Sequence, residues 1–372
     1  MAPKVDITSK ENDILYFTLS NTNVSIANSL RRTVLSDIPA VVFKTAPSNK
    51  SDIKIIENTS IFNNEIVQQR LGCIPIHIND YENYPYKNYM LEVNVENTTE
   101  NVIFVTTADF KIKNKINNTY IKESELKEIF PPDNYTGDFI EFLRLKPKLS
   151  SELMGEKIHL TGDFSVSTAK EDGMYNVVSN CTYACTIDPI AQKTVLDQLK
   201  QTWKDQGKTK EEIDFETENW KLLDGQRIVK KDSFDFKIET IGVYSNEEII
   251  KIACEVLSKK LDDLDKLIDN DNLEIKQSDT TIQNAFDIIL ENEDHTLGKV
   301  IEYYLYNKFY IGDNNLLSYC GFKKMHPHDT YSIIRLGYKS PITESSIKGH
   351  FKECIADAKI NYKIIMKPFL NK

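Results

Sequence analysis

The stretch NTNVSIANSLRRTVLSDIPAVVF, residues 21–43, decides the fold because it predicts a helix that stops sharply and continues into a strand. Ser25 suits the N-cap position, since its hydroxyl can accept a backbone N–H of the first turn. The apolar residues that follow recur at i, i+4 and i+8 and form one helical stripe: Ile26, Leu30 and Val34. Pro39 ends the helix, and AVVFK after it favours a strand. Two adjacent arginines, Arg31 and Arg32, make the middle of this short helix cationic.

The composition is that of an ordinary globular protein with an acidic balance. The chain has 372 residues, of which 40% are hydrophobic and 27% charged, and this length favours two or three domains. The formal net charge is -10 and the sequence pI is about 5.3. Such a chain lacks the overall positive field that draws proteins to nucleic acid, so a free-standing DNA-binding role is disfavoured.

Cysteine usage and hydropathy predict a soluble, intracellular protein without a structural zinc site. The six cysteines form no CxxC pair, and the closest two, Cys181 and Cys185, stand four positions apart in a β-rich segment. The N-terminus lacks the apolar core of a signal peptide, and no apolar run approaches the ~20 residues that span a bilayer. The triplet Asn97-Thr98-Thr99 is therefore interpreted as incidental rather than as a glycosylation site.

The N-terminal half alternates between strands and short helices. DILYFTLS at 13–20 predicts a strand, and residues 61–71 predict a helix that Gly72 and Pro75 close. From about 76 to 183, alternating runs such as MLEVNVEN and KIHLTGDFSVS are separated by turn residues and interrupted by one helix around ELKEIF. This pattern predicts a mainly β insert domain.

The C-terminal half is more helical. Residues 190–232 are charged and mostly helical, with Trp203 and Trp220 as expected anchors, and DSFDFKIETIG predicts a strand. The segment 246–264 is strongly amphipathic, and the polar, acidic residues after it are interpreted as a linker. The last unit predicts a strand, a helix, two strands and a long helix at 344–362. The expected organisation is a first unit in two parts (1–50 and 184–265), an insert domain (51–183), a linker (266–280) and a second unit (281–372).

The C-terminal unit repeats the pattern of the opening stretch at a constant offset of 271 residues. The matched positions around the turn pair Leu19 with Leu290, Asn21 with Asn292 and Ser25 with Thr296. The apolar stripe recurs as Leu297, Ile301 and Leu305. Chance similarity between two strand–turn–helix pieces is the alternative explanation.

Two related units with apolar helical faces would bury those faces against each other. The predicted fold class is therefore α+β, with two units that form an internal pseudo-dimer, the first interrupted by the insert. We expect the six stripe residues to make the intramolecular contact. The copies differ where the first has Arg31 and Arg32 and the second has Glu302 and Tyr303. Such a platform would present different chemistry on its two halves and would suit two different partners.

These residues resemble a known family, the alpha-like subunits of DNA-directed RNA polymerases. NTNVSIANSLRRTVLSDIPA resembles the signature dimerisation helix of the third-largest subunit of eukaryotic RNA polymerase II, and Arg70–Ile76 resembles its R-L-G-x-I-P-x run. Glu293–Gly298, with YCGFKKMHPHDTYSIIRL after it, resembles the eleventh subunit of that enzyme. The likeness covers nearly the whole chain in order, with 76–183 matched by topology more than by motif. It implies that two units are fused in one chain. This arrangement is similar to the polymerase subunit fusions of large DNA viruses that transcribe in the cytoplasm.

The resemblance implies a non-catalytic assembly subunit that docks the largest and second-largest polymerase subunits and binds small assembly subunits, with no membrane partner. Arg31, Arg32, Arg70 and Asn28 would lie at the subunit interface, since arginine's planar fork suits carboxylates and backbone carbonyls. A solvated cationic face is the alternative interpretation of these arginines. DNA and RNA would be met only indirectly through the complex, and the catalytic magnesium would lie in the large subunits. The expected location is the cytoplasm of the infected cell and the virion for a viral enzyme, and otherwise the nucleus.

One departure from the family concerns zinc. Eukaryotic versions of the larger subunit often carry a zinc-binding cysteine cluster in the insert, whereas residues 76–180 here contain no cysteine, so that metal is not carried over. Other clusters that could suggest chemistry have simpler explanations. The HPH stretch at 326–328 fits a turn between strands, and Asp294 or Thr296 fits a helix cap.

Two rival functions come from other classes of protein. A free-standing nucleic-acid-binding transcription regulator could use the same fold, but the net charge of -10 argues against it. A nucleotide hydrolase would need a P-loop, and Gly207-Lys208-Thr209 lacks a glycine five positions before its own, because position 202 is Thr. We therefore expect that this chain does not catalyse a reaction by itself.

Overall fold

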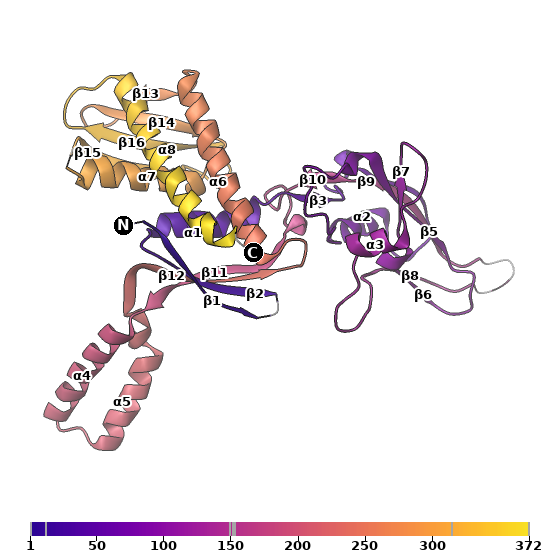
Figure 1. Ribbon diagram of the computed structural model, residues 1–372, viewed down its shortest axis with the longest axis horizontal. Coiled ribbons are helices and arrows are strands. Elements are labelled where there is room, and N and C mark those ends of the chain that lie inside the picture. Colours follow the sequence, from indigo (N-terminus) through magenta and orange to yellow (C-terminus); the bar gives the residue numbers. More distant parts are fainter. Residues whose placement is uncertain (1, 12, 149, 151–153, 314, 371–372) are drawn as a thin grey trace. The chain divides into compact units, whose positions relative to one another are not determined.

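The computed structural model describes residues 2–11, 13–148, 150, 154–313 and 315–370. Its contacts divide the chain into two compact units: unit 1, formed by Met1–Thr33, Cys181–Ile238 and Ile250–Lys372, and unit 2, formed by Val34–Asn180 and Glu239–Ile249. Figure 1 labels the helices and strands of both units. The mixture of helix and sheet confirms the predicted α+β class.

The first sheet of unit 1 has four strands in the order β1-β2-β12-β11. The strands are β1 (Lys4–Glu11), β2 (Ile14–Ser20), β12 (Val229–Thr240) and β11 (Val178–Ile187). Alternate residues of β2 are buried, namely Leu15, Phe17 and Leu19, which is the pattern of a sheet with one face in the core. Phe17 stacks on Phe236 with ring centroids 4.8 Å apart. Sequence reasoning missed β1, because most of its residues are exposed and its pairing with β2 defines it.

Two helices follow strands of this sheet. Helix α1 (Val24–Ser36) follows β2, and α6 (Asn246–Asp269) follows β12. The predicted N-cap of α1 is wrong by two residues. The side-chain oxygen of Asn23 accepts the backbone N–H of Ser25 at 2.9 Å, so Asn23 makes the cap and Ser25 lies inside the first turn.

The second sheet of unit 1 lies in the C-terminal part and has the order β13-β14-β16-β15. Its strands are β13 (Ile275–Gln277), β14 (Ala285–Glu291), β16 (Tyr331–Tyr338) and β15 (Leu317–Lys323). Helix α7 (His295–Leu305) continues into a π-helical turn, Tyr306–Ile311, and α8 (Glu344–Met366) is the last long helix. The segment 266–280, expected to be a linker, holds the end of α6 and strand β13, which pairs with β14.

The acidic residues that suggested a linker are partners of lysines on α8. The lysines are Lys348, Lys352 and Lys359, and their respective partners are Asp271, Asp269 and Asp262. Asp262 and Asp269 lie in the last part of α6, and Asp271 follows its end. Exposed ion pairs contribute little by themselves. The apolar residues Leu264 and Ile268 at this end of α6 are buried, and their burial favours an ordered helix where the composition alone indicated a solvated chain.

The two sheets of unit 1 repeat one another. The bounds of β2 and β14 differ by the offset of the sequence repeat, and so do the first residues of α1 and α7. In each sheet, this strand lies between the strand that precedes it in sequence and the strand that leads toward a long helix. The repeat therefore extends from sequence to strand order.

A hairpin of two helices, α4 (Pro189–Asp205) and α5 (Lys210–Leu222), connects β11 to β12 (Figure 1). Its base is closed by a hydrogen bond from the Asp188 N–H to the Ile228 carbonyl, at 3.0 Å. The side chains of Trp203 and Trp220 are half-buried. Residues 190–232 are mostly helical, as predicted, and β12 begins at Val229.

Unit 2 is mainly β, with helices α2 (Asn64–Gly72) and α3 (Glu123–Ile129). Its sheets have the orders β4-β9-β5-β7, β6-β8 and β10-β3. The strands are β3 (Ala40–Val42), β4 (Ile53–Asn58), β5 (Tyr89–Glu96), β6 (Ile103–Thr106), β7 (Lys111–Asn114), β8 (Glu141–Leu145), β9 (Lys157–Asp163) and β10 (Ser165–Ser167). One apolar cluster forms the core, including Phe43, Val67, Leu91, Phe142 and Leu160. Helix α2 begins at Asn64 rather than at 61, because the Asn63 side chain caps it.

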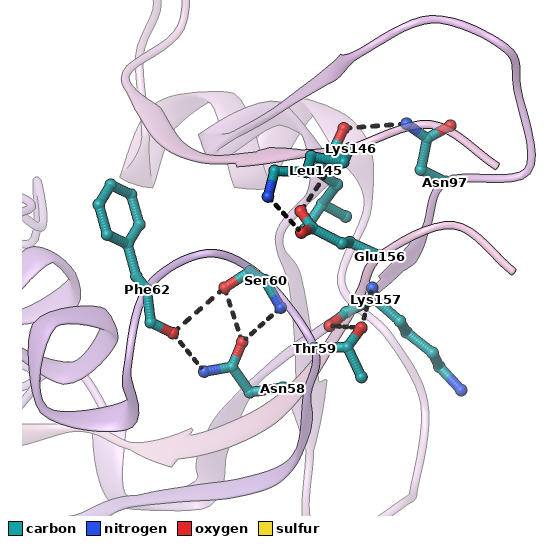
Figure 2. A network of polar contacts seen from close by, with 9 residues as sticks. All are labelled: Asn58, Thr59, Ser60, Phe62, Asn97, Leu145, Lys146, Glu156 and Lys157. Carbon is teal, nitrogen blue, oxygen red and sulfur yellow. Dashed lines mark hydrogen bonds and ion pairs between the residues drawn. The ribbon is translucent and has the colours of Figure 1, made fainter. Parts of the chain in front are cut away.

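Polar contacts hold the ends of strands in unit 2, as Figure 2 shows. The Asn97 side chain is fully buried, and its amide nitrogen donates to the carbonyls of Asn101 and Leu145, at 2.8 and 2.9 Å. Glu156 accepts the backbone N–H of Lys146 at 2.8 Å. Asn97 therefore links neighbouring backbone segments, and its amide nitrogen forms hydrogen bonds within the chain.

The long helices α6 and α8 have one buried side and one polar side. Each contributes a row of fully buried residues, such as Leu257 and Leu261 in α6 and Phe351 and Ala358 in α8. Across the described part of the chain, none of the helices has the length and apolar character that a bilayer crossing requires.

Candidate subunit-docking site

The candidate site is built on α1 and α7, which start from the same kind of turn. Asn21 and Asn292 both have left-handed backbone, with φ of 57° and 58°, a region that asparagine tolerates better than most residues. Two residues later, the side chains of Asn23 and Asp294 each accept the backbone N–H two positions on, at 2.9 and 2.8 Å. The predicted cap at Asp294 is confirmed, and the matched turns give the two helices the same start.

The apolar stripes of α1 and α7 are in the core. The six residues, each no more than 1% exposed, are Ile26, Leu30, Val34, Leu297, Ile301 and Leu305. Burial of this extent is what an apolar contact between helices requires. The contact of one stripe with the other stays a prediction.

Arg32 is engaged by the N-terminus of α7 within unit 1. Its Nη2 donates to Asp294 Oδ2 at 2.8 Å, and its Nε donates to Thr296 Oγ1 at 2.9 Å. Burial disfavours the charged form of Asp294, but the hydrogen bonds from Thr296 and the charge of Arg32 outweigh it and lower the pKa of Asp294 to about 2. Arg32 therefore links α1 to α7.

A buried hydrogen bond links α1 to α8. The oxygens of Ser29 and Tyr362 are 2.7 Å apart, and Ser29 Oγ also donates to the Ile26 carbonyl at 2.7 Å. Because the Ser29 proton is used in that second bond, the Tyr362 hydroxyl is the donor between the helices. Burial raises the pKa of Tyr362 far above its ordinary range, so this donor keeps its proton.

Arg31 and Asn28 lie together on another side of α1. Arg31 Nε donates to Asn28 Oδ1 at 3.0 Å, and the guanidinium makes no ion pair with a residue of the described ranges. Burial raises the pKa of the Cys181 thiol to about 12 and also raises that of Tyr183, and the charge of Arg31 opposes both shifts. Arg31 is thus a half-exposed cation whose donors are only partly used.

A cavity of about 530 Å³ lies beside Asn28. Its lining includes Val24 and Asn28 of α1, Tyr183 of β11, and Tyr303 with Tyr306 at the end of α7. A lining of aromatic rings with a few polar groups is typical of sites that accept an apolar side chain. The cavity and Arg31 together could hold an apolar residue that is followed or preceded by a carboxylate.

One charged pair on the cavity wall is already neutralised. Lys299 Nζ lies 2.6 Å from Glu302 Oε2, and the other Glu302 oxygen accepts the Phe322 backbone N–H at 3.1 Å. Lys299 stands at the position of the repeat that corresponds to Asn28. Arg31, which corresponds to Glu302, is therefore the source of uncompensated charge at this site.

Arg70 lies in unit 2, where it attaches α2 to β8. Its Nε donates to the Phe142 carbonyl at 2.6 Å and its Nη2 to the Glu141 carbonyl at 3.0 Å. The guanidinium carbon is 5.6 Å from the centre of the Phe62 ring, a cation–π distance. The arginine of the R-L-G run thus supports the packing of α2.

The clusters that could suggest metal binding are parts of turns and caps. The backbone N–H of His326 donates to Asp329 Oδ2 at 2.9 Å, which confirms a turn at the HPH stretch. Within the ranges that the structure describes, no three His, Cys, Asp or Glu side chains are arranged to hold a metal ion.

Sequence reasoning did not find the partners of α1 inside unit 1. Arg32 was expected to face another subunit, and the pairing with Asp294 could be found only by asking which acid lies at the start of the second copy. Ser29 gave a weak signal, since a hydroxyl on the apolar side of a helix needs a buried partner. Tyr362 gave none, because one tyrosine among 18 is not distinctive.

Comparison with known proteins finds a match to one family and to several relatives. The family model of the RNA polymerase Rpb3/Rpb11 dimerisation domain matches residues 16–261. The DNA-directed RNA polymerase II subunit rpb3 of Dictyostelium discoideum is 22% identical over 306 residues, which cover 70% of this chain and 93% of that protein. The DNA-directed RNA polymerase subunit Rpo3 of Methanosphaera stadtmanae is 21% identical over 278 residues, covering 70% and 96%. A conjugation stage-specific protein of Tetrahymena thermophila is 25% identical over 304 residues, covering 70% and 93%.

Proposed function

The chain belongs to the family of the RNA polymerase Rpb3/Rpb11 dimerisation domain, and we propose that it is a non-catalytic assembly subunit of a multisubunit DNA-directed RNA polymerase. The similarity to polymerase subunits over nearly their whole length supports this role. RNA synthesis, and the magnesium ions that it uses, would then belong to the large subunits of the complex.

In this proposal, two related units are fused in one chain and pair as an internal pseudo-dimer, the first interrupted by the mainly β insert. The shared strand order, the matched turns and the links from α1 to α7 and α8 support the pairing. The family match ends at residue 261, before β13. The matched part would then correspond to the larger subunit of the family, and the second unit would be fused to its C-terminal end. Such a fusion resembles the subunit fusions of large DNA viruses that transcribe in the cytoplasm. The location proposed with it is the cytoplasm of the infected cell and the virion for a viral protein, and otherwise the nucleus.

The proposed docking site for a large subunit is the side of α1 that carries Asn28 and Arg31, with the cavity beside it. The observation that carries this assignment is the unequal use of the two arginines. Arg32 is held by Asp294 and Thr296, whereas Arg31 makes one hydrogen bond and no ion pair with a described residue. One half of the pseudo-dimer would dock the second-largest subunit and the other half the largest.

The test is the variant Arg31→Glu, co-expressed with the tagged large subunits and isolated at moderate salt. We expect recovery of the variant with the large subunits to fall at least about tenfold, since breaking a buried charged contact costs on the order of 2–5 kcal/mol. Arg144→Glu is the matched control, because Arg144 is an exposed arginine of unit 2 with 61% side-chain exposure. Arg32→Glu is unsuitable, because it would also break the link to α7.

Circular dichroism and hydrogen exchange should show that Arg31→Glu folds as the wild type does. Undiminished recovery of a folded variant would contradict the role of Arg31. A wild-type chain that never co-purifies with large subunits would contradict the assembly function itself. Binding to DNA by the isolated chain, with a steep dependence on salt, would instead favour a nucleic-acid-binding regulator.

A further inference from the structure

The outer face of α5, the side turned away from the hairpin interior, carries large apolar side chains in solvent. Phe215 is 72% exposed and Leu222 is 75% exposed. Their spacing of seven residues places them on one side of the helix, two turns apart. Leu223, just after the helix, is 60% exposed as well. Single exposed apolar residues are normal, but a pair of large ones on one side of a short helix forms an apolar surface that a partner can cover.

The hairpin interior uses other residues of α5. Thr217 is buried, Ile213 and Trp220 are half-buried, and the Trp220 ring packs against Gly225 so closely that a Cβ there would lie about 3.1 Å from it. These residues lie on the opposite side of the helix from Phe215 and Leu222. Phe215 and Leu222 therefore do not contribute to the packing of the hairpin interior.

The outer face is also acidic. Helix α5, Lys210–Leu222, contains five carboxylates and two lysines. Glu211 and Glu218 lie four positions before and three positions after Phe215, so both are its neighbours on the helix surface, and Asp214 lies between them in sequence. Glu218 pairs with Lys221, whereas Glu211 and Asp214 form no ion pair with any residue of the described ranges. Phe215 and Leu222 thus project from a surface of negative potential.

We propose that the outer face of α5 docks a basic amphipathic helix of a partner protein, with Phe215 and Leu222 as the apolar anchors. Such a helix would place apolar residues at i, i+3, i+4 and i+7 on the anchors and its lysines or arginines against the carboxylates. The charge disfavours DNA, RNA and anionic membranes, which would be repelled. A second copy of the chain would bring two acidic faces together, which is unfavourable.

This surface is separate from the docking site on α1 and does not depend on it. The hairpin is inserted between two strands of one sheet, so an occupant could bind without disturbing the two apolar stripes of the pseudo-dimer. The natural occupant would be a protein that acts on the assembled polymerase or that is carried with it. The inference goes beyond the assembly role, and it can fail while that role holds.

The test uses the full chain and a fluorescein-labelled 18-residue peptide of leucine and lysine whose leucines lie on one helical face. Fluorescence anisotropy measures its dissociation constant at low and at physiological salt. We expect binding to the wild type that weakens with salt. The double variant Phe215→Ala, Leu222→Ala should bind at least tenfold more weakly at the same salt. Asp214→Lys, Glu218→Lys should bind more weakly and lose most of the salt dependence.

Three controls make the outcome decisive. A scrambled peptide of the same composition, with no apolar face, should bind at least tenfold more weakly to the wild type. A peptide with glutamate in place of lysine should not bind. Tyr135→Ala, which removes an 85% exposed aromatic residue of unit 2, should bind as the wild type does. Equal binding of the ordered and scrambled peptides, or equal binding by the wild type and the Phe215, Leu222 variant, would overturn the proposal.

Each variant is expected to fold, because the side chains replaced are mostly in solvent. Thermal unfolding followed by circular dichroism checks this before binding is measured. Sedimentation of the wild type at high concentration tests the remaining alternative, in which a second copy of the chain binds this face. A dimer that the Phe215→Ala, Leu222→Ala change abolishes would show that this face binds a second copy and would overturn the proposal of a basic partner.

Discussion

Asp294→Asn removes the charge that holds Arg32 while keeping an oxygen that can still cap α7. The wild-type carboxylate accepts from Arg32 Nη2 at 2.8 Å and from the Thr296 N–H at 2.8 Å. The asparagine oxygen can keep the second bond, so the loss is confined to the link between α1 and α7. This link is one of the contacts that would hold the two copies of the repeat together.

The size of the effect follows from the pKa of Asp294. Burial opposes ionisation, yet the bonds from Thr296 and the charge of Arg32 lower the pKa from 3.8 to about 2. Each unit of such a shift is worth about 1.4 kcal/mol, so ionised Asp294 stabilises unit 1 by roughly 2 kcal/mol at neutral pH. The Asp294 side chain is 27% exposed, so added salt should reduce this figure only in part.

The sign of the pH dependence is fixed by the lowered pKa. A carboxyl whose pKa is lower in the folded state contributes its stability above the unfolded pKa, near 4, and loses it as the pH falls toward about 2. The difference in unfolding free energy between the wild type and Asp294→Asn should therefore be constant from pH 7 to about pH 5. It should narrow below about pH 4, because Asp294 of the unfolded wild type takes up a proton there, whereas Asp294 of the folded wild type stays ionised down to about pH 2.

The assay is urea unfolding at a series of pH values, followed by circular dichroism. Because the chain has two compact units, hydrogen exchange of peptides from α1 and α7 assigns the transition to unit 1. Asp6→Asn is the control, since Asp6 pairs with Lys4 on the exposed surface, where such pairs contribute little. A difference that stays the same down to pH 3, or no difference at pH 7, would refute the reasoning.

Three further substitutions test single contacts. Gly298→Ala should destabilise unit 1 by about 1–3 kcal/mol in urea unfolding, because the added Cβ would overlap the Phe322 ring; unchanged stability would mean that the ring can move aside. Tyr362→Phe should cost about 1 kcal/mol in the same assay, since Ser29 keeps its bond to a carbonyl and is not left unpaired; a loss above about 3 kcal/mol would contradict this. Asp188→Ala should remove the N-cap of α4 and cost about 1 kcal/mol locally, measured as faster hydrogen exchange in the first turn of α4, and equal exchange rates would count against the cap.

The sequence was informative where local rules decide the structure. The presence of a helix after β2, the helix around ELKEIF and the order of elements after β14 follow from periodicity and turn residues, and the structure confirms them. The repeat was also visible, since its turns depend on asparagine and aspartate at fixed positions. These features are local in the chain, so one sequence is enough to predict them.

The features that sequence reasoning missed depend on contacts between distant residues. Strand β1 has no apolar face of its own and is defined by its pairing with β2. The expected linker contains the end of α6, where the apolar residue Ile268 is buried. Arg32 was expected at a subunit interface, and its contact with Asp294 was missed for the same reason, because that partner is 262 positions away. Composition describes a segment's own preference, and tertiary partners can override it.

The two copies agree where they build the turns and differ where α1 and α7 meet other groups. Asn21 and Asn292 share one backbone conformation, so the fold requires similar residues at both positions. At the position of Arg31, however, the second copy has Glu302, and that carboxylate is used internally by Lys299 and the Phe322 backbone. At this matched position, the first copy therefore presents an arginine that makes no ion pair with a residue of the described ranges, whereas the second copy presents a paired carboxylate. In the proposed assembly subunit, this asymmetry would give one face suited to a carboxylate-bearing partner and one that is not, which would help the subunit to tell two large partners apart.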